Sequence, residues 1–135
     1  GEQISAAPGF MLVVSYNPGY QNLLKGLKPS TRQRFVAMAF DYPDAARERE
    51  ILMREAGIDA GLAERLVRLG HGLRALKDHD LDEGASTRLL IYAATLMRAG
   101  LAPRAACRAA LIEPLTDDTA TLLALQEVVD VAFPG

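Results

Sequence analysis

Hydrophobic residues follow two different patterns along this chain, and the change occurs near residue 44. Before it, residues 10–14 (FMLVV) and 35–40 (FVAMAF) are short continuous apolar runs, each closed by turn-forming residues. Such runs are typical of strands buried on both faces, as in a parallel sheet. The segment between them carries Leu23, Leu24 and Leu27 and is long enough for a short crossover helix. This part predicts a strand, a helix and a strand, too few strands for a sheet that is stable by itself.

From residue 44 onward the apolar positions recur with the 3.6-residue period of helices. Gly57 and Gly100 are placed to end two of these helices, because glycine readily adopts the left-handed conformation that follows many helices. Capping residues and an early proline predict the helix starts. The expected starts are Asp44, Asp59, Ser86, Pro103, and Thr116 or Asp117. This part of the chain therefore predicts a bundle of about five helices.

Two of the expected helices have a clear buried face. In the second, leucines recur in steps of four and three at Leu62, Leu66, Leu69, Leu73 and Leu76. Gly70 and Gly72 interrupt this stripe, and each costs up to about 1 kcal/mol relative to alanine inside a helix. We therefore expect a kink or a close helix contact there. The last helix is expected to face inward through Leu122, Leu125, Val128, Val129 and Phe133.

Composition narrows the class of protein. The chain has 135 residues, of which 50% are hydrophobic, and a formal net charge of −2. This balance predicts one soluble globular domain or two small subdomains. It provides no overall attraction for nucleic acid or an anionic membrane, both of which bind concentrated positive charge. GEQISAAPGF does not resemble a signal peptide, so we expect no membrane insertion and a cytoplasmic location.

The residues best suited to bind metal are few. Cys107 is the single cysteine, and His71 and His79 lack the spacing of a helical metal pair. We therefore expect no metal site formed by this chain. A lone cysteine in an alanine-rich helix is usually a small buried apolar residue, and Cys107 is interpreted in that way.

Polar side chains at the ends of the predicted apolar elements indicate a site that binds phosphate. Asn17 follows the first run, Arg34 precedes the second, and Arg88 lies near the start of the third helix. Each also has a structural explanation. Asn17 belongs to an Asn-Pro-Gly turn, and Arg34 and Arg32 can complement the dipole at a helix end. Arg88 can be a surface residue, although an arginine near a helix N-terminus opposes the dipole, and a phosphate contact would explain it.

Three segments, in this order and spacing, resemble one family: VVSYNPGYQ, then LKPSTRQRF followed by an apolar run and DYP, then EGASTRLL. They resemble the second half of the MoxR-type AAA+ ATPases, in the subgroup that contains CbbQ, NorQ, NirQ and the gas-vesicle protein GvpN. The resemblance extends from about residue 10 to residue 133. It implies a mostly α chain: residues 1–43 would be the last strands of the AAA+ α/β core, and residues 44–135 its helical lid.

The resemblance also implies roles for the polar residues. Asn17 would be the sensor 1 residue, which positions a phosphate oxygen or the attacking water. Arg34 would be the arginine finger delivered to the nucleotide of a neighbouring subunit, with Arg32 in a supporting or pore-facing role. Arg88 would be the sensor 2 arginine, which contacts the γ-phosphate in its own subunit. Asn17 and Arg88 are thus the expected contacts to ATP from this chain.

The function that the resemblance implies is ATP-driven remodelling. A hexameric ring would act with a partner bearing a von Willebrand factor A domain on a target metalloenzyme. The activity would be Rubisco activation of the CbbQ type or nitric oxide reductase maturation of the NorQ type. The cofactors would be ATP and Mg²⁺. No GxxxxGK[ST] loop and no strand with a magnesium-binding acidic pair occur in this sequence, so the chain alone is expected to be inactive. Both segments are expected upstream of residue 1.

Two other classes of function are compatible with the residues. One is a helical protein-interaction module without nucleotide chemistry. The other is a DNA-binding helix-turn-helix formed by STRLLIYAATLMRAGLAPRAACRAALI, which has two predicted helices around a glycine turn. The acidic balance argues against nucleic acid as a partner.

Overall fold

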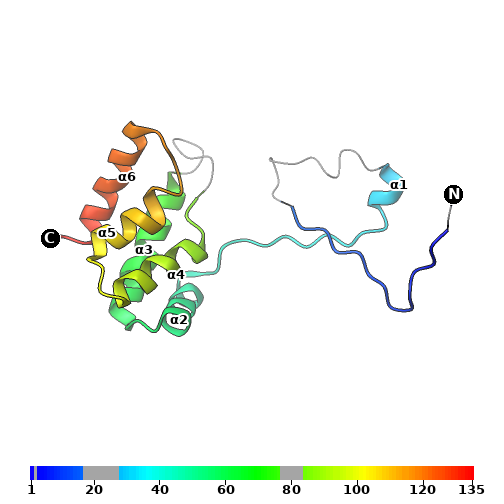
Figure 1. Cartoon of the computed structure of the whole chain (residues 1–135), viewed down its shortest axis with the longest axis horizontal. Coiled ribbons are helices and arrows are strands. Elements are labelled where there is room, and N and C mark those ends of the chain that lie inside the picture. The colour runs from blue at the N-terminus through cyan, green and yellow to red at the C-terminus, as the bar shows by residue number, and fades with distance from the viewer. Residues whose placement is uncertain (2, 17–27, 77–83) are drawn as a thin grey trace. The chain divides into compact units, whose positions relative to one another are not determined.

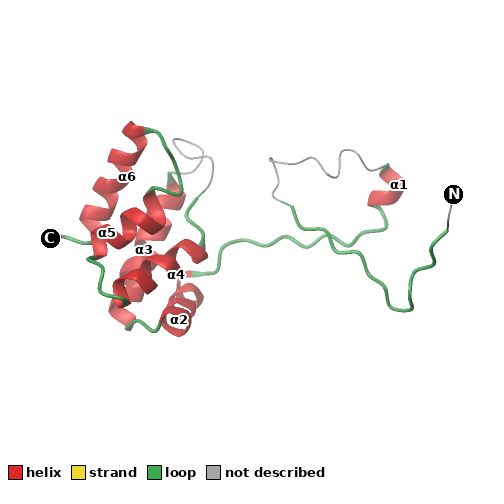
Figure 2. Ribbon diagram, viewed as in Figure 1, coloured by secondary structure: helices red, strands yellow, loops and turns green. Residues whose placement is uncertain are grey.

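The computed structural model describes residues 1, 3–16, 28–76 and 84–135. The chain forms two units, residues 1–40 and residues 41–135 (Figure 1). Over the described residues the secondary structure is helical, with six α-helices, one π-helical segment and no strand (Figure 2). The prediction of a mostly α chain is confirmed.

In residues 1–40, the described positions include one short helix, α1 (Pro29–Arg32), which begins with proline in its first turn. Gly9 turns the chain with a φ of 81°, and the Phe10 N–H donates to the Ala7 carbonyl at 3.1 Å. The two apolar runs at 10–14 and 35–40 were predicted as strands, and neither forms one. A strand is defined by hydrogen bonds to a neighbouring strand, and the described residues provide no such neighbour for either run.

Residues 41–135 contain the helical bundle. Its elements are α2 (Ala45–Ala56), α3 (Ala60–Ala75), α4 (Thr87–Arg98), α5 (Pro103–Cys107), the π-helical η1 (Arg108–Ile112) and α6 (Thr119–Ala132). The side chains of Asp44, Asp59 and Ser86 accept hydrogen bonds from the first turns of α2, α3 and α4. These three predicted caps are confirmed, because each satisfies a backbone N–H that the helix itself leaves unpaired.

Two details of the bundle differ from the sequence prediction. Helix α6 begins one or two residues later than expected, because Asp118 caps it and accepts from the Thr121 N–H at 2.8 Å. The fourth helix begins at Pro103 as predicted but widens into η1, where the Glu113 N–H donates to the Arg108 carbonyl at 3.0 Å. That five-residue hydrogen bond defines a π turn, which propensity and period do not show.

The hydrophobic core joins all the helices of residues 41–135. Helix α2 packs against α3 and α4, and α3 packs against α6. The largest apolar side chains that are fully buried are Leu52, Leu66, Leu73, Leu90, Leu111, Ile112, Leu125 and Val129. The predicted buried faces of α3 and α6 are confirmed, with Leu62, Leu76, Leu122 and Val128 only partly buried at the edge of the core.

Gly70 marks the closest approach of two helices. A Cβ atom at this position would lie 2.8 Å from Leu90 Cδ1 on helix α4, a distance that real Cβ atoms do not adopt. Helix α3 runs through Gly70 and Gly72 without interruption. Of the two outcomes predicted for these glycines, the structure therefore shows the close helix contact.

Gly57 and Gly100, the two glycines predicted to end helices, both have a positive φ, as expected. Gly57 follows α2 with φ 65° and ψ 36°, and its N–H donates to the Met53 carbonyl. Gly100 follows α4 with a φ of 101°. These conformations strain any side chain with a Cβ, which explains why glycine occupies both positions.

Candidate functional site

Arg32 and Arg34 lie at the end of helix α1, and both side chains are exposed. Arg32 is the last residue of the helix, where its charge complements the dipole. Arg34 follows in a turn, in which its N–H donates to the Thr31 carbonyl at 3.1 Å. Asn17, the third predicted contact, lies outside the described residues.

Arg88 is the second residue of helix α4 and is exposed. The Ser86 side chain caps the same turn and accepts from the Leu89 N–H at 3.3 Å. Among the residues that the structure describes, no carboxylate forms an ion pair with Arg88. Its guanidinium therefore carries a positive charge at the positive end of a helix dipole, and none of the described carboxylates neutralises it.

Arg34 and Arg88 belong to different units of the chain, residues 1–40 and residues 41–135. The predicted convergence of Asn17, Arg34 and Arg88 on one phosphate stays a prediction. What the structure does show is how the first turn of α4, which carries Arg88, is held.

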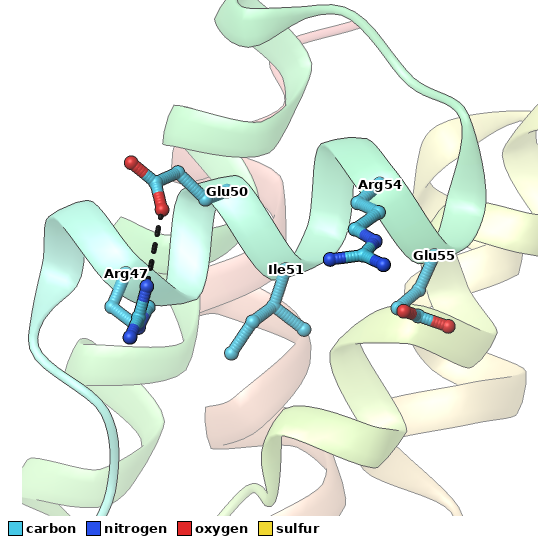
Figure 3. Close-up of a pocket in the computed structure, with 5 residues that line it drawn as sticks. All are labelled: Arg47, Glu50, Ile51, Arg54 and Glu55. Carbon is cyan, nitrogen blue, oxygen red and sulfur yellow. Dashed lines mark ion pairs between the residues drawn. The ribbon is translucent and has the colours of Figure 1, made fainter.

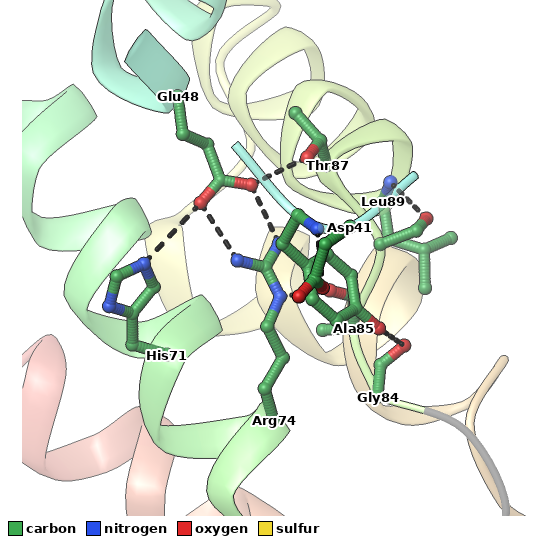
Figure 4. A network of polar contacts seen from close by, with 10 residues as sticks. Asp41, Glu48, His71, Arg74, Gly84, Ala85, Thr87 and Leu89 are labelled. Atoms are coloured by element: carbon green, nitrogen blue, oxygen red, sulfur yellow. Dashed lines mark hydrogen bonds and ion pairs between the residues drawn. The ribbon is translucent and has the colours of Figure 1, made fainter. Parts of the chain in front are cut away.

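A group of polar residues centred on the buried Glu48 contacts that turn, and Figure 4 shows Glu48, His71, Arg74 and Thr87 of this group. We call it the Glu48 cluster: Tyr42, Glu48, His71, Arg74 and Thr87. Glu48 on α2 is fully buried and faces Arg74 on α3, which is 9% exposed. Arg74 binds the carboxylate with both terminal nitrogens, Nη1 to Oε2 at 2.9 Å and Nη2 to Oε1 at 2.6 Å. Two parallel charge-assisted hydrogen bonds fix the relative direction of the two side chains.

Two further side chains complete the contacts of Glu48. The Thr87 hydroxyl donates to Oε1 at 2.6 Å, and His71 Nε2 lies 3.7 Å from Oε2. Burial raises the pKa of Glu48, but the hydrogen bonds from Arg74 and Thr87 and the charges of Arg74 and His71 lower it by more. The net shift is downward, so Glu48 is ionised at neutral pH.

Arg74 also contacts the backbone before α4 and the chain before α2. Its Nε donates to the Ala85 carbonyl at 2.7 Å, and its Cζ lies 4.0 Å from the centre of the Tyr42 ring. A guanidinium over an aromatic face is a favourable cation–π contact. The Tyr42 hydroxyl in turn donates to the Gly84 carbonyl at 3.5 Å.

Sequence reasoning did not identify Glu48 or Arg74. The available signal was the register of α2, in which Glu48 shares one face with Leu52 and Ala56, both buried. A charged residue on an apolar stripe requires a partner of opposite charge, because a lone buried charge is very costly. The sequence contains many arginines, and only the fold selects Arg74 among them.

Cys107, the potential metal ligands and one surface depression were the other candidates among the described residues. Cys107 is buried, as predicted, and burial raises the pKa of its thiol to about 12, so it is not a reactive thiolate. The described residues contain no group of three potential metal ligands. A shallow depression on α2 is lined by Arg47, Glu50, Ile51, Arg54 and Glu55 (Figure 3). All of these residues come from one helix, and within the described part of the chain no other element adds a side chain that would enclose a ligand.

None of the helices in the described part of the chain combines the length and apolar character that crossing a membrane requires.

Comparison with known proteins relates the chain to one group. Residues 48–132 match the family model described as CbbQ/NirQ/NorQ C-terminal. The chain is 63% identical to the denitrification regulatory protein NirQ of Stutzerimonas stutzeri, over 98% of this chain and 48% of the relative. It is 59% identical to the protein NorQ of Paracoccus denitrificans, over 98% of this chain and 49% of NorQ.

The protein CbbQ of Hydrogenophilus thermoluteolus is 51% identical, over 98% of this chain and 50% of CbbQ. The chain thus spans about half the length of the curated relatives that it matches. The resemblance to the CbbQ, NorQ and NirQ group, predicted from three short segments, is confirmed. Because the family model covers more than half of the sequence, this chain belongs to the CbbQ/NirQ/NorQ C-terminal family.

Proposed function

We propose that this chain is the C-terminal portion of a hexameric AAA+ ATPase of the MoxR type. The observation that carries the proposal is its similarity to NirQ, NorQ and CbbQ over 98% of its length. The complete protein remodels or activates a metalloenzyme together with a partner that bears a von Willebrand factor A domain. Residues 44–135 would form its helical lid, after residues 1–43 of the α/β core.

Arg88 is the residue of the described structure that best fits a nucleotide phosphate. It is exposed, it lies in the first turn of α4, and within the described residues it has no acidic partner. A planar guanidinium with five N–H donors suits phosphate oxygens, and the helix N-terminus adds positive potential. Arg88 would bind the γ-phosphate in its own subunit and so report whether ATP or ADP is bound.

Arg34 and Asn17 supply the remaining contacts in this proposal. Arg34 would neutralise charge on the γ-phosphate of the neighbouring subunit, and Arg32 would support it. Asn17 would orient the attacking water through its side-chain amide. Bound Mg²⁺ would neutralise charge on the phosphates, and its ligands are expected in the part of the protein that precedes this chain.

For the target, we propose a metalloenzyme of denitrification, with nitric oxide reductase as the expected one. Identity to NirQ (63%) and NorQ (59%) exceeds identity to CbbQ (51%), which favours denitrification over Rubisco activation. To test this choice, the complete protein is expressed in cells that lack the ATPase, and nitric oxide reductase activity should be restored. If the complete protein instead restored the activity of inhibited Rubisco, the choice would be overturned.

The ATPase is tested in the complete protein by three variants. Arg34→Ala should lower turnover by about 10³-fold or more while ATP still binds, because an arginine finger acts on the transition state. Arg88→Ala should weaken ATP binding and uncouple it from lid position. Arg68→Ala is the matched control, since Arg68 is an exposed arginine on α3 whose ion pair among the described residues is with Glu64 of its own helix, at 3.7 Å. Full activity of the first two variants would contradict the proposal, as would ATP turnover by the 135-residue chain alone.

A further inference from the structure

The three residues before Arg88 are each held by a separate contact. The Ala85 carbonyl accepts from Arg74 Nε at 2.7 Å, the Ser86 hydroxyl caps the helix, and the Thr87 hydroxyl donates to Glu48 at 2.6 Å. Two of these contacts come from the Glu48 cluster on α2 and α3. The backbone from which the Arg88 side chain extends is therefore fixed by other helices, while the side chain itself is exposed.

Stability alone does not explain a buried ion pair at this position. Replacing such a pair with apolar side chains of similar volume is often neutral or stabilising, because removing two charges from water is costly. An apolar pair, however, does not fix the relative orientation of its two side chains. The Arg74 guanidinium meets the Glu48 carboxylate through two hydrogen bonds and the Ala85 carbonyl through a third, and this allows only one arrangement of the groups.

Tyr42 connects the segment before helix α2 to the Glu48 cluster. It lies just before helix α2, with its ring over the Arg74 guanidinium and its hydroxyl on the Gly84 carbonyl. The contact is tight, because a Cβ at Gly84 would lie 3.1 Å from both the Tyr42 hydroxyl and Arg74 Cγ. The cluster thus contacts the segments that lead into α2 and into α4.

We propose that Arg74, Glu48 and Tyr42 are positioning residues for Arg88. The cluster fixes the start of α4 against the segment by which the chain enters the lid, so that Arg88 meets a nucleotide phosphate in one orientation. A displacement of Tyr42 is then transmitted through Arg74 to the Ala85 carbonyl and Thr87, and so to Arg88. This inference rests on the proposed function, in which Arg88 binds the γ-phosphate.

A double-mutant cycle in the complete protein tests the inference. Arg74→Lys keeps the charge but loses the paired hydrogen bonds, and should weaken binding of a fluorescent ATP analogue about tenfold. In an Arg88→Ala background the same substitution should change binding by less than about twofold, because Arg74 acts through Arg88. The melting temperature should fall equally in both backgrounds. Equal weakening of ATP binding in the two backgrounds would overturn the proposal.

Arg104→Lys is the matched control. Arg104 also donates its Nε to a backbone carbonyl, that of Phe133 at 2.8 Å, and lies 3.2 Å from the Asp130 carboxylate. Neither partner belongs to the first turn of α4. This variant should lower the melting temperature without changing ATP binding.

A second variant tests the inference at a residue that lies outside the hydrophobic core. Tyr42→Leu removes the ring from Arg74 at a residue that is 41% exposed, so the fold should persist. It should weaken ATP binding about threefold, and again only when Arg88 is present. Unchanged ATP binding in this variant would overturn the part assigned to Tyr42.

Hydrogen exchange separates failure of the inference from failure of the proposed function. In the 135-residue chain, Arg74→Lys should speed exchange of the Leu89 and Leu90 amides about tenfold, because both bond to Ser86 in the turn that the cluster holds. Unchanged exchange would overturn the inference by itself. Faster exchange together with normal ATP binding by Arg88→Ala would instead show that Arg88 does not bind the phosphate.

Discussion

Phe10 in residues 1–40 leaves 69% of its surface exposed, whereas Phe133 in residues 41–135 leaves 4%. The same contrast applies to the aliphatic residues. Leu12 and Val36 are exposed in the first region, and Leu90 and Val129 are buried in the second. Both regions are rich in apolar residues, so hydrophobicity alone does not account for the difference.

The difference lies in which partners each region contains. Every helix of residues 41–135 finds a complementary face on another helix of the same region. The apolar runs of residues 1–40 are of the kind that pair in a sheet, and the described chain offers no neighbouring strand. A hydrophobic pattern predicts that a segment will be buried, but the rest of the protein determines where.

The largest expected effect is at the ion pair of the second region. Glu48→Ala should lower the free energy of unfolding of the 135-residue chain by about 3–5 kcal/mol, because it leaves the Arg74 charge buried without its partner. Urea denaturation followed by circular dichroism at 222 nm measures this loss, since the helical signal comes mainly from residues 41–135. A loss below about 1 kcal/mol would show that water solvates Arg74 in the variant.

A matched pair of leucines compares the two regions directly. Leu90→Ala should destabilise the bundle by about 2–5 kcal/mol, because Leu90 is fully buried against α3. The same substitution at Leu12, which is 60% exposed, should change stability by less than about 0.5 kcal/mol. The same denaturation experiment measures both variants. Comparable losses would mean that residues 1–40 pack more extensively in solution than in this structure.

Lowering the pH should destabilise residues 41–135 gradually, and by less than the substitutions described above. The pKa of Glu48 is lower in the folded chain than in the unfolded chain, so the folded chain binds this proton less readily. The stabilisation is complete above the unfolded value, about 4.3, and is lost as the pH falls through the folded value.

Thermal unfolding measured between about pH 7 and pH 3 should therefore show a declining melting temperature below about pH 5. The decline should be shallower in Glu48→Gln, which does not titrate at this position. It should not vanish, because hydrogen bonds from Thr121 also lower the pKa of Asp118. An equally steep decline in the variant would assign the acid sensitivity to other carboxylates.

The helical bundle could be predicted in most respects because its signals are local. Caps such as Asp44 and Ser86 act within one turn, and leucine spacing reports the buried face directly. The π turn at η1 could not be predicted, since neither helix propensity nor the spacing of apolar residues marks it. The two strands were predicted from runs that require partners, and those partners are not among the described residues.

The candidate site likewise contains residues that could be predicted from the sequence and residues that could not. Arg34 and Arg88 were identified from short sequence frames, and in the structure both are exposed near helix ends, while their roles stay a prediction. The Glu48–Arg74 pair was missed because its residues are 26 positions apart and meet only when α2 packs against α3. A contact at that separation leaves no periodic trace in a single sequence.

The contact between Gly70 and Leu90 links two positions that are remote in the sequence. Because a Cβ at residue 70 would lie 2.8 Å from Leu90 Cδ1, any larger residue at 70 requires Leu90 to move or to be replaced by a smaller residue. The two positions therefore constrain each other where α3 and α4 cross, although they are 20 positions apart in the sequence.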